Sequence, residues 1–508
     1  MDRTPFDSGG KVKNVILLHT DQMRADGVGC MGNRFVRTPR IDGLAADGTV
    51  YTRHIVSNPI CSPSRASLLT GLYPPGHGLW CNGVALNRLD YVEISGQPGE
   101  GEAVVLTEPK TMGDVFAEAG YDTASFGKLH LTPTRAPVSY GYPETCAAWE
   151  AGKFEGWTGP YYGFRHVELT IGHGRDAFRA AHYAEWLRRE HPEVMRAVRE
   201  SGKAHPITKL SQLYALPMPS RLHHSWWLAE RICAYLRERE GKKEPFFAFV
   251  GFPDPHHPFV PCEDVVGEFE GIDVPEPVDV EGRGVEGSPL AGVCQRKAEG
   301  LTREDLRKVI RYTYAMICQI DRAVGRILDE LERTGLAEQT IVAFTSDHGD
   351  FRGDHGRLQK ALGASDSLLR VPLVVRAPGA GLPKRVEGVT SNCDVLPTLT
   401  RLAGVKAPEG LHGTDMHAPG GEGRTAMCFA ATGRARDVNY TVYDGTHRMT
   451  WYPGHNFVEL FDHRTDPGEC CNVAGRAENR ERVEEMKRAA MEGLARMNNP
   501  INGRVSAW

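Results

Sequence analysis

Short apolar runs rich in Val, Ile and Phe alternate along the chain with longer segments in which apolar residues recur every three or four positions. The short runs predict buried strands, and the longer segments predict amphipathic helices. The clearest strand candidates are residues 15–18, 246–252, 340–345 and 371–375. Because strands and helices alternate, we expect an α/β fold with a large, mostly parallel sheet sandwiched between helices.

Residues 303–334 form the clearest helix candidate, with apolar side chains at helical spacing along the whole segment. Thr302 is suited to cap its N-terminus, and Gly335 is suited to end it. A second candidate, residues 478–497, is heavily charged, so we expect it to lie on the surface.

The alternation of strands and helices weakens after residue 410, and residues 440–452 alternate as antiparallel strands do. A chain of 508 residues is also too long for one ordinary hydrophobic core. We therefore predict a main domain of residues 1–420 and a smaller C-terminal α+β subdomain of residues 421–508. The subdomain would hold a short antiparallel sheet and the terminal helix.

Two long stretches, residues 133–221 and 262–300, show no regular pattern and are predicted to be loops. Loops of this length in a compact protein are usually functional or disordered. The first stretch is rich in aromatic residues, which would either line a ligand pocket or pack beneath the loop. The aromatic residues in question are Trp157, Tyr161, Tyr162 and Phe164, together with Trp226 and Trp227 farther along.

The composition argues against several classes of protein. The net charge of −5 and the lack of a long basic run disfavour a nucleic-acid partner. No apolar stretch approaches the ~20 residues that a membrane-spanning helix needs, and the polar start of the chain has no secretory core. The 12 cysteines include no Cys-x-x-Cys pair, so we expect reduced thiols in a cytoplasmic protein rather than a disulfide framework.

Acidic and imidazole residues follow three of the predicted strands: Asp21 the first, His256 the second, and Asp347 with His348 the third. In open α/β sheets, ligands bind at the carboxyl ends of the strands, so these side chains are expected to meet at one edge. Two carboxylates with an imidazole suit a divalent cation such as Ca²⁺, Mg²⁺ or Mn²⁺. The alternative is that each Asp caps a helix or a turn.

The run Pro-Ile-Cys-Ser-Pro-Ser-Arg-Ala-Ser-Leu-Leu-Thr-Gly at residues 59–71 is the most specific motif in the chain. Its last residues predict a short helix that ends at Gly71. Cys61 would lie near the N-terminus of that helix, where free N–H groups and the helix dipole favour an anion. The alternative interpretation is a buried structural thiol.

This run resembles the signature of the type I sulfatases, the formylglycine-dependent branch of the alkaline phosphatase superfamily. Three further segments are similar to sulfatase motifs: residues 120–130, 255–259 and 346–360. Residues 459–469 resemble the family's C-terminal subdomain, so the resemblance covers nearly the whole chain. It implies an alkaline-phosphatase-like fold and the hydrolysis of a sulfate monoester to an alcohol and inorganic sulfate.

The resemblance also implies the chemistry of the site. A separate maturing enzyme would oxidise Cys61 to formylglycine, whose hydrated aldehyde attacks the sulfur atom. Asp21, Asp347 and His348, with position 61, would hold one divalent cation, either Ca²⁺ or Mn²⁺, with Mg²⁺ as a further candidate. The remaining implied roles are sulfate binding by Lys128 and Lys360, protonation of the departing alcohol by His256 with Lys360, proton removal from the second hydroxyl by His130, and support of the aldehyde by Arg65.

Two positions depart from the commonest sulfatase pattern: Gln22 replaces a second Asp after the first strand, and His348 replaces an Asn. Both departures resemble the subgroup that contains the choline sulfatases and the phosphonate monoester hydrolases. Asn82 lies where that subgroup has an active-site Asn, so Gln22 and Asn82 are candidates for substrate binding. Lys128 and His130 favour a sulfate monoester, because the phosphonate hydrolases tend to have Tyr and Thr there.

Two other functions stay open at this point. One is a phosphonate monoester or phosphodiester hydrolase on the same scaffold, and the other is a binding protein that keeps the fold without the activity. The expected partners are a small-molecule sulfate ester and the maturing enzyme. The sequence leaves the oligomeric state open, a homo-oligomer included.

Overall fold

The computed structural model describes residues 13–86, 109–201, 210–289, 298, 300–419, 423–431 and 437–497. Parts of four predictions lie outside these ranges: the polar start of the chain, residues 202–209 of the predicted loop 133–221, the end of the predicted loop 262–300, and the boundary between residues 420 and 421. The domain boundary therefore stays a prediction. Among the described helices, none combines the length and the hydrophobicity that crossing a bilayer requires.

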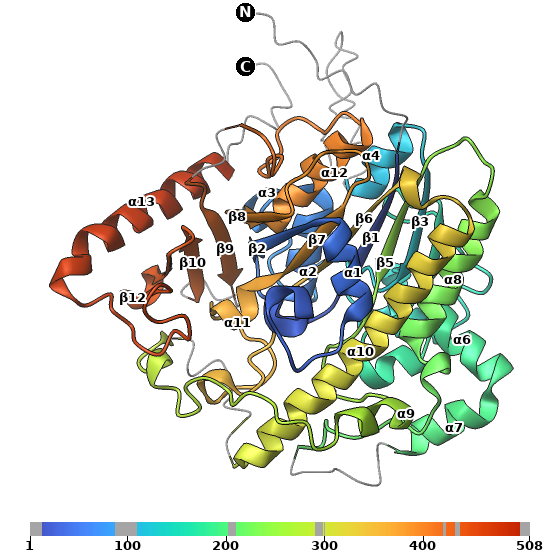
Figure 1. Cartoon of the computed structure of the whole chain (residues 1–508), viewed down its shortest axis with the longest axis horizontal. Helices are drawn as coiled ribbons and strands as arrows, with labels where there is room; N and C mark the ends of the chain where they lie inside the picture. Colours follow the sequence, from blue (N-terminus) through green and yellow to red (C-terminus); the bar gives the residue numbers. More distant parts are fainter. Residues whose placement is uncertain are drawn as a thin grey trace, which may run out of the picture.

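A sheet of eight strands in the order β4-β3-β5-β1-β6-β7-β2-β8 forms the centre of the molecule (Figure 1). Its strands are β1 (Asn14–Thr20), β2 (Thr49–Ile55), β3 (Asp122–Gly127), β4 (His166–Leu169), β5 (Phe246–Gly251), β6 (Thr340–Ser346), β7 (Arg370–Arg376) and β8 (Arg385–Ser391). The four predicted strands are confirmed as β1, β5, β6 and β7. β7 runs antiparallel to both of its neighbours, and the other pairs are parallel. The prediction of a mostly parallel sheet is thus confirmed.

Alternate residues of the sheet face two separate hydrophobic cores. In β1, Ile16 and Leu18 pack into one core, whereas Val15 and Leu17 pack into the other. The helices that pack in the first core include α1 (Pro39–Asp47), α8 (His224–Arg239) and α10 (Arg303–Arg333). The helices that pack in the second core include α2 (Cys61–Thr70), α4 (Met112–Glu118) and α12 (Val395–Ala403). The sheet is therefore sandwiched between helices, as expected.

The long helix α10 matches its predicted limits because its end signals are local. The Thr302 side chain accepts a hydrogen bond from the backbone of Asp305, whose carboxylate accepts the Thr302 N–H in return. Beyond the C-terminus, Gly335 adopts a left-handed conformation with φ of 68°. Its apolar stripe packs on α8 and α1 over the first core.

A second sheet of four antiparallel strands, in the order β12-β11-β10-β9, follows in the C-terminal part of the chain. Its strands are β9 (Ala426–Ala431), β10 (Val438–Tyr443), β11 (His447–Tyr452) and β12 (Phe457–Asp462). The predicted strands at 440–452 are confirmed as the hairpin of β10 and β11. Helix α13 (Arg480–Met497) packs a narrow apolar stripe on this sheet and exposes most of its charged residues (Figure 1).

The expectation that residues 133–221 are irregular is wrong. The edge strand β4 and three helices lie in this stretch, and they are α5 (Cys146–Glu150), α6 (Ala181–Glu190) and α7 (Pro192–Ser201). These elements are short, and most of their apolar side chains face one of the two large cores rather than forming a long regular stripe. The remaining short helices are α3 (Pro74–His77), α9 (Glu263–Val266) and α11 (Asp366–Leu369).

The aromatic residues of this stretch are part of the hydrophobic packing. Tyr162 and Phe164 are buried in the second core, with Trp157 and Tyr161 packed against it. Trp227 is buried in the first core, and Trp226 lines a separate surface groove beside α10. The structure thus favours packing over an aromatic ligand pocket.

Candidate active site

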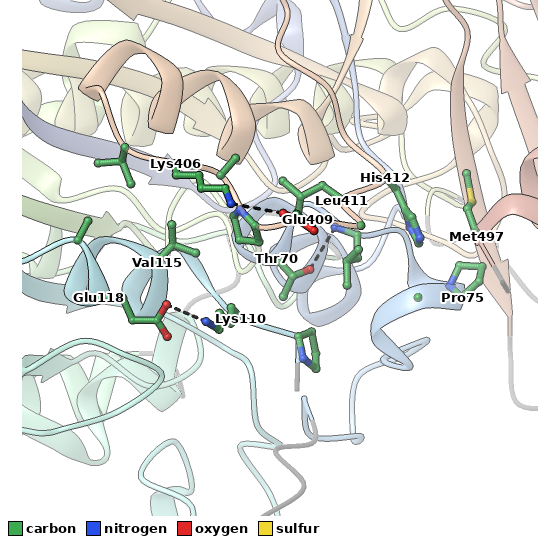
Figure 2. Close-up of a pocket in the computed structure, with 18 residues that line it drawn as sticks. Thr70, Pro75, Lys110, Val115, Glu118, Lys406, Glu409, Leu411, His412 and Met497 are labelled. Atoms are coloured by element: carbon green, nitrogen blue, oxygen red, sulfur yellow. Dashed lines mark hydrogen bonds and ion pairs between the residues drawn. The ribbon is translucent and has the colours of Figure 1, made fainter. Parts of the chain in front are cut away.

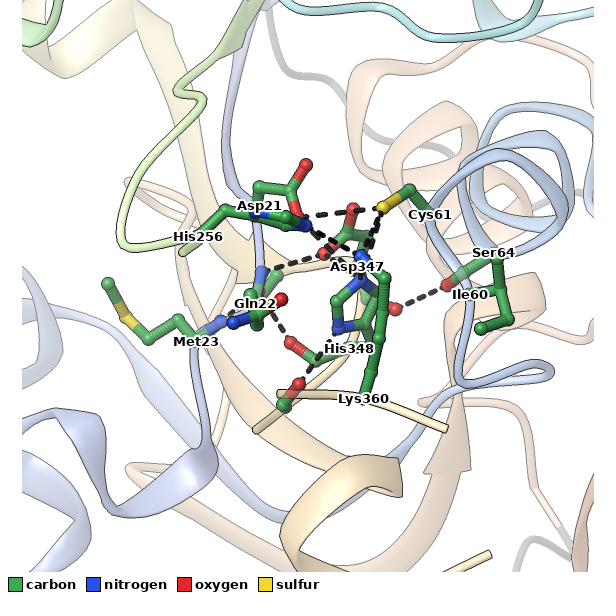
Figure 3. A network of polar contacts seen from close by, with 12 residues as sticks. Asp21, Gln22, Met23, Ile60, Cys61, Ser64, His256, Asp347, His348 and Lys360 are labelled. Atoms are coloured by element: carbon green, nitrogen blue, oxygen red, sulfur yellow. Dashed lines mark hydrogen bonds and ion pairs between the residues drawn. The ribbon is translucent and has the colours of Figure 1, made fainter. Parts of the chain in front are cut away.

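Four neighbouring parallel strands bring the predicted site residues to one edge of the large sheet. Asp21 follows β1, Lys128 follows β3, His256 lies beyond β5, and Asp347 with His348 follows β6. The carboxyl ends of these strands meet because β3, β5, β1 and β6 are adjacent and parallel. The predicted meeting of these side chains at one sheet edge is confirmed (Figure 3).

Cys61 is the first residue of α2 and is buried, with 1% of its surface exposed. Its Sγ atom lies 2.7 Å from Lys360 Nζ, 3.3 Å from His348 Nε2 and 3.7 Å from Asp21 Oδ1 (Figure 3). Beside it, the Asn82 side chain accepts the Ser62 N–H at 3.1 Å. A nucleophile at position 61 would therefore meet a helix N-terminus, a lysine and an imidazole together.

The charges around Cys61 favour an anion at this position. Burial and the Asp21 carboxylate oppose ionisation of the thiol, but Lys360, Lys128 and His348 outweigh them and lower the pKa of Cys61 well below its usual range. An unmodified thiol at this position would therefore lose its proton more readily than a free cysteine. The same field would stabilise an ionised hydroxyl at this position.

Asp21, Cys61, Asp347 and His348 present four ligand atoms that all lie within 4.8 Å of one another. His348 Nδ1 donates to the Gly349 carbonyl at 2.8 Å, so Nε2 is the ring nitrogen that faces the other three groups. Asp21 Oδ1 and Asp347 Oδ1 each lie 3.6 Å from that nitrogen. Two carboxylates and an imidazole fit a divalent cation such as Ca²⁺, Mn²⁺ or Mg²⁺.

Arg65 and Lys128 hold the two carboxylates in place from the other side. Arg65 lies 2.8 Å from Asp347 Oδ2 and 3.3 Å from Asp21 Oδ2, and Lys128 also contacts Asp21 Oδ2. Burial would raise the pKa of Asp21, but Lys128 and Arg65 hold it well below its usual range. The structure thus places Arg65 between the carboxylates rather than in contact with Cys61, and its predicted role at the aldehyde stays a prediction.

Lys360 joins Cys61 to His256. Its Nζ atom lies 2.8 Å from His256 Nε2 and 3.0 Å from His348 Nε2. His256 Nδ1 donates to the His257 carbonyl at 2.5 Å, so Nε2 accepts the hydrogen bond from Lys360. Burial and the neighbouring His173 lower the pKa of His256 well below its usual range. Lys360 therefore carries the proton that the two residues share.

Gln22 contacts this cluster, whereas His130 has no hydrogen bond to it in the described structure. The Gln22 side chain donates to Asp350 and accepts from His257 at 3.1 Å, while its backbone N–H donates to Asp347 Oδ1. His130 Nδ1 is buried without a hydrogen-bond partner in the described structure. No hydrogen bond or ion pair within the described ranges joins His130 to Cys61, so its role as a base stays a prediction.

The structure adds residues that the sequence pattern did not single out. The ring of His173 stacks on His256 with centroids 3.5 Å apart, and His257 stacks on the same ring at 4.0 Å. His19 is fully buried, and burial and Arg65 lower its pKa to about 3. Glu144 accepts backbone N–H groups of the segment that carries His130. Only His257 had a signal in the sequence, as the neighbour of His256.

A cavity of about 960 Å³ lies at the opposite end of α2, beside Thr70 (Figure 2). Thr70 and Cys61 are the two ends of α2, so the cavity lies roughly 13 Å from Cys61 along the helix. Its charged side chains are paired, Lys110 with Glu118 and Lys406 with Glu409 (Figure 2). This cavity is therefore separate from the candidate active site and offers no free cation among these residues.

Comparison with known proteins identifies the family. The family model named Sulfatase matches residues 13–405, and a second model, N-sulphoglucosamine sulphohydrolase, C-terminal, matches residues 353–496. The chain belongs to the sulfatase family. The predicted type I sulfatase of the alkaline phosphatase superfamily is thus confirmed, and the enzyme is a sulfuric ester hydrolase.

Relatives of this sulfatase cover nearly its whole length. An arylsulfatase of Clostridium perfringens is 26% identical over 504 residues, which cover 95% of this chain and 94% of the relative. A multifunctional alkaline phosphatase superfamily protein of Trinickia caryophylli is 28% identical and covers 91% of each chain. The crystal structure of a phosphonate monoester hydrolase of Agrobacterium radiobacter superposes with a TM-score of 0.76, at 25% identity and 96% coverage of both chains.

Proposed function

We propose that this sulfatase hydrolyses a sulfate monoester by means of a formylglycine made from Cys61 and one divalent cation. The observation that carries the proposal is the convergence on Cys61 of Lys360, His348 and Asp21 at 2.7, 3.3 and 3.7 Å. The Sγ atom stands in for the oxygen atoms of the hydrated aldehyde. The roles below are proposals for individual residues of the enzyme.

The cation would be held by Asp21, Asp347 and His348, with position 61 as a further ligand. When bound, it would supply positive charge that lowers the pKa of a hydroxyl and anchors a sulfuryl oxygen. Arg65 and Lys128 keep both carboxylates ionised and oriented for this task. Ca²⁺ and Mn²⁺ are the first candidates, with Mg²⁺ after them.

Formylglycine at position 61 would supply two hydroxyls on one carbon, one as the nucleophile for sulfur and one that would allow the sulfate to be released. Lys128 and Lys360 would offset the negative charge of the sulfuryl oxygens, and Asn82 and Gln22 would contact the substrate beside them. His130, whose Nδ1 atom is buried without a partner in the described structure, would accept the proton of the second hydroxyl.

His256 and Lys360 would act together on the departing alcohol. Their hydrogen bond of 2.8 Å shares a proton that rests on Lys360, because burial and two neighbouring imidazoles disfavour a charged His256. As charge develops on the leaving oxygen, that proton would pass to it either directly from Lys360 or through His256 Nε2.

Replacing Cys61 tests the proposal. Cys61→Ala should abolish multiple turnover of p-nitrophenyl sulfate, and Cys233→Ala is the control because it removes another buried thiol in α8. In active wild-type protein, the peptide that contains Cys61 should be lighter by about 18 Da, the mass difference between Cys and formylglycine. Wild-type turnover in Cys61→Ala, or fully active protein with only unmodified Cys61, would refute the proposal.

A phosphonate monoester hydrolase is the second candidate function. The superposition on the enzyme of Agrobacterium radiobacter supports it, because the two chains match over 96% of their lengths. Sulfate and phosphonate monoesters share a tetrahedral centre and a single negative charge near neutral pH, so one site can turn over both. The ratio of kcat/KM for p-nitrophenyl sulfate to that for a phenyl phosphonate ester distinguishes them, and we expect the sulfate to be preferred because Lys128 and His130 are present.

The proposed partners are a small sulfate ester and the enzyme that oxidises Cys61. The cytoplasmic location and a homo-oligomeric state stay predictions of the sequence. Co-expression with a formylglycine-generating enzyme should raise the specific activity of recombinant protein in proportion to the modified fraction of Cys61.

A further inference from the structure

A second cluster of metal-binding side chains lies behind the active site. His223 caps the N-terminus of α8, His224 is its first residue, and Asp254 follows β5. One ligand atom from each of the three residues lies within 4.8 Å of the others. All three side chains are buried, with exposed fractions of 1%, 2% and 2%. None of the sulfatase motifs includes the two histidines.

Asp254 lies too far from the two histidines for a hydrogen bond to either of them. His223 Nε2 lies 3.6 Å from Asp254 Oδ2, and His224 Nε2 lies 3.6 Å from Asp254 Oδ1. Both distances exceed the range of an N–H···O hydrogen bond, and neither His223 Nε2 nor Asp254 Oδ2 has a partner in the described structure. The Ser225 N–H donates to His223 Nδ1 in a long hydrogen bond of 3.4 Å, which a zinc ion bound at Nε2 would replace, because the ring proton would then lie on Nδ1.

The separations do fit a shared metal ion. Zinc bonds to imidazole nitrogen and carboxylate oxygen are ~2.0–2.2 Å long, so ligand atoms of a tetrahedral site lie roughly 3.3 Å apart. A buried carboxylate needs a cation or a proton, and in the described chain the ion pairs of Asp254 involve only these two histidines.

We propose that His223, His224 and Asp254 bind a zinc ion that is distinct from the cation of the active site. Two imidazoles and one carboxylate form a ligand set that suits Zn²⁺ better than Ca²⁺ or Mg²⁺. A water molecule would complete the coordination. The site is independent of the proposed function, because it shares no ligand with the Cys61 cluster.

A zinc ion at this site would hold segments of the active site in position. The Asp254 carbonyl accepts the N–H of Asp21 at 3.1 Å, and His256 lies two residues farther along the chain. The zinc ion would therefore tie the start of α8 to the loop that supports both Asp21 and His256. It is a positioning device for the active site rather than part of its chemistry.

Metal content per chain tests the proposal. Full-length protein is dialysed against Zn²⁺ with excess Ca²⁺ and analysed by elemental mass spectrometry. We expect wild type and the active-site variant Asp347→Asn to retain one zinc ion per chain. In Asp254→Asn the zinc affinity should fall by roughly tenfold or more, a loss that removal of even an outer-shell partner can cause.

His54→Gln is the matched control, because His54 is another fully buried histidine whose Nε2 atom has no partner in the described structure. It should leave the zinc content unchanged. Circular dichroism establishes that each variant is folded. If Asp254→Asn does not fold, the zinc content of Asp347→Asn tests the proposal. If Asp347→Asn does not fold either, the zinc content of wild type tests it. Absence of zinc in the folded protein that tests the proposal, or full retention of zinc in folded Asp254→Asn, overturns it.

Discussion

At the scale of single residues, the properties of Cys61 and Lys360 come from their neighbours. Burial would lower the pKa of Lys360, but the Cys61 thiolate and Asp21 outweigh burial and raise it above its usual value. Lys360 therefore remains an ammonium that contacts position 61 and His256 at the same time. A cation in this place can stabilise negative charge on the sulfuryl group and also hold a proton for the leaving oxygen.

We predict that Lys360→Ala lowers kcat about 10²–10³-fold, the usual cost of removing one preorganised electrostatic contact, with a smaller change in KM. The loss should be greater for alkyl or phenyl sulfate than for p-nitrophenyl sulfate, because a better leaving group needs less protonation. Steady-state kinetics over a series of leaving groups measures this difference.

The control for this series is Lys110→Ala, which removes an exposed lysine that pairs with Glu118. It should leave every rate unchanged. An equal loss for good and poor leaving groups in Lys360→Ala would restrict Lys360 to sulfate binding and would contradict its role in proton transfer.

At the scale of elements, the free backbone groups at helix ends are hydrogen-bonded by side chains that are distant in sequence as well as by neighbouring cap residues. The first turn of α1 is capped from α10: Asp321 Oδ1 accepts the N–H groups of Arg40 at 3.0 Å and of Ile41 at 2.9 Å. Asp321 is buried, and burial raises its pKa to about 6. The same carboxylate thus stabilises one helix and carries an energetic cost when it is ionised.

This raised pKa predicts a pH-dependent stability. The pKa of Asp321 is higher in the folded protein than in the unfolded chain. Its contribution to the free energy of unfolding is therefore complete at a pH below the pKa of the unfolded chain, and it is lost as the pH rises through about 6. Asp321→Asn cannot ionise, so its free energy of unfolding relative to wild type should rise by about 1 kcal/mol between pH 5 and pH 8. Urea denaturation at both pH values measures it.

Asp329→Asn on the same helix is the control, because Asp329 is 65% exposed at its side chain. Its effect on unfolding should not change between the two pH values. If Asp321→Asn behaved in the same way, the carboxyl group of Asp321 would not titrate near pH 6 in the folded protein.

At the scale of the whole molecule, the two sheets are joined by buried polar contacts. The Phe429 N–H donates to the Ser57 carbonyl at 2.8 Å, just before the segment that carries Cys61. Glu469, after the last strand, accepts from Arg448 at 2.5 Å and His463 at 2.8 Å through one oxygen and from the Asp366 N–H at 3.0 Å through the other. The C-terminal part therefore supports the loops that form the active site.

We predict that Glu469→Gln lowers the free energy of unfolding by about 3 kcal/mol, because it leaves the buried Arg448 without its main partner. Burial opposes ionisation, but Arg448 and His463 hold the pKa of Glu469 well below its usual range. The stabilising contribution is thus present above the unfolded carboxyl pKa and is lost as the pH falls. The difference from wild type should therefore shrink in acid, which thermal unfolding across pH would measure.

The exposed pair of Glu409 and Lys406 provides the control for this substitution. Glu409→Gln should change stability by less than about 1 kcal/mol at any pH. A comparable effect of both substitutions would mean that the buried contacts of Glu469 do not join the two parts.

The sequence by itself determined the features that depend on local periodicity and on compact motifs. The limits of α10, the four core strands and the helix that starts at Cys61 follow from the spacing of apolar residues and from caps next to them. The direction of β7 was not predictable, because an apolar run has the same pattern in a parallel and an antiparallel strand. The short helices between residues 133 and 221 were not predicted, because their apolar side chains pack into cores that are formed mainly by residues of other segments.

The tertiary structure alone decided which groups became neighbours. Asp21, Cys61, Asp347 and Lys360 each belong to a recognisable motif, but only folding brings the strand ends together and sets the fields that shift their pKa values. His173 stacks on His256, and His223 with His224 faces Asp254, across separations that carry no trace in the sequence. The physical reason is that the sequence encodes local conformation and burial, whereas distances between side chains arise when buried surfaces pack.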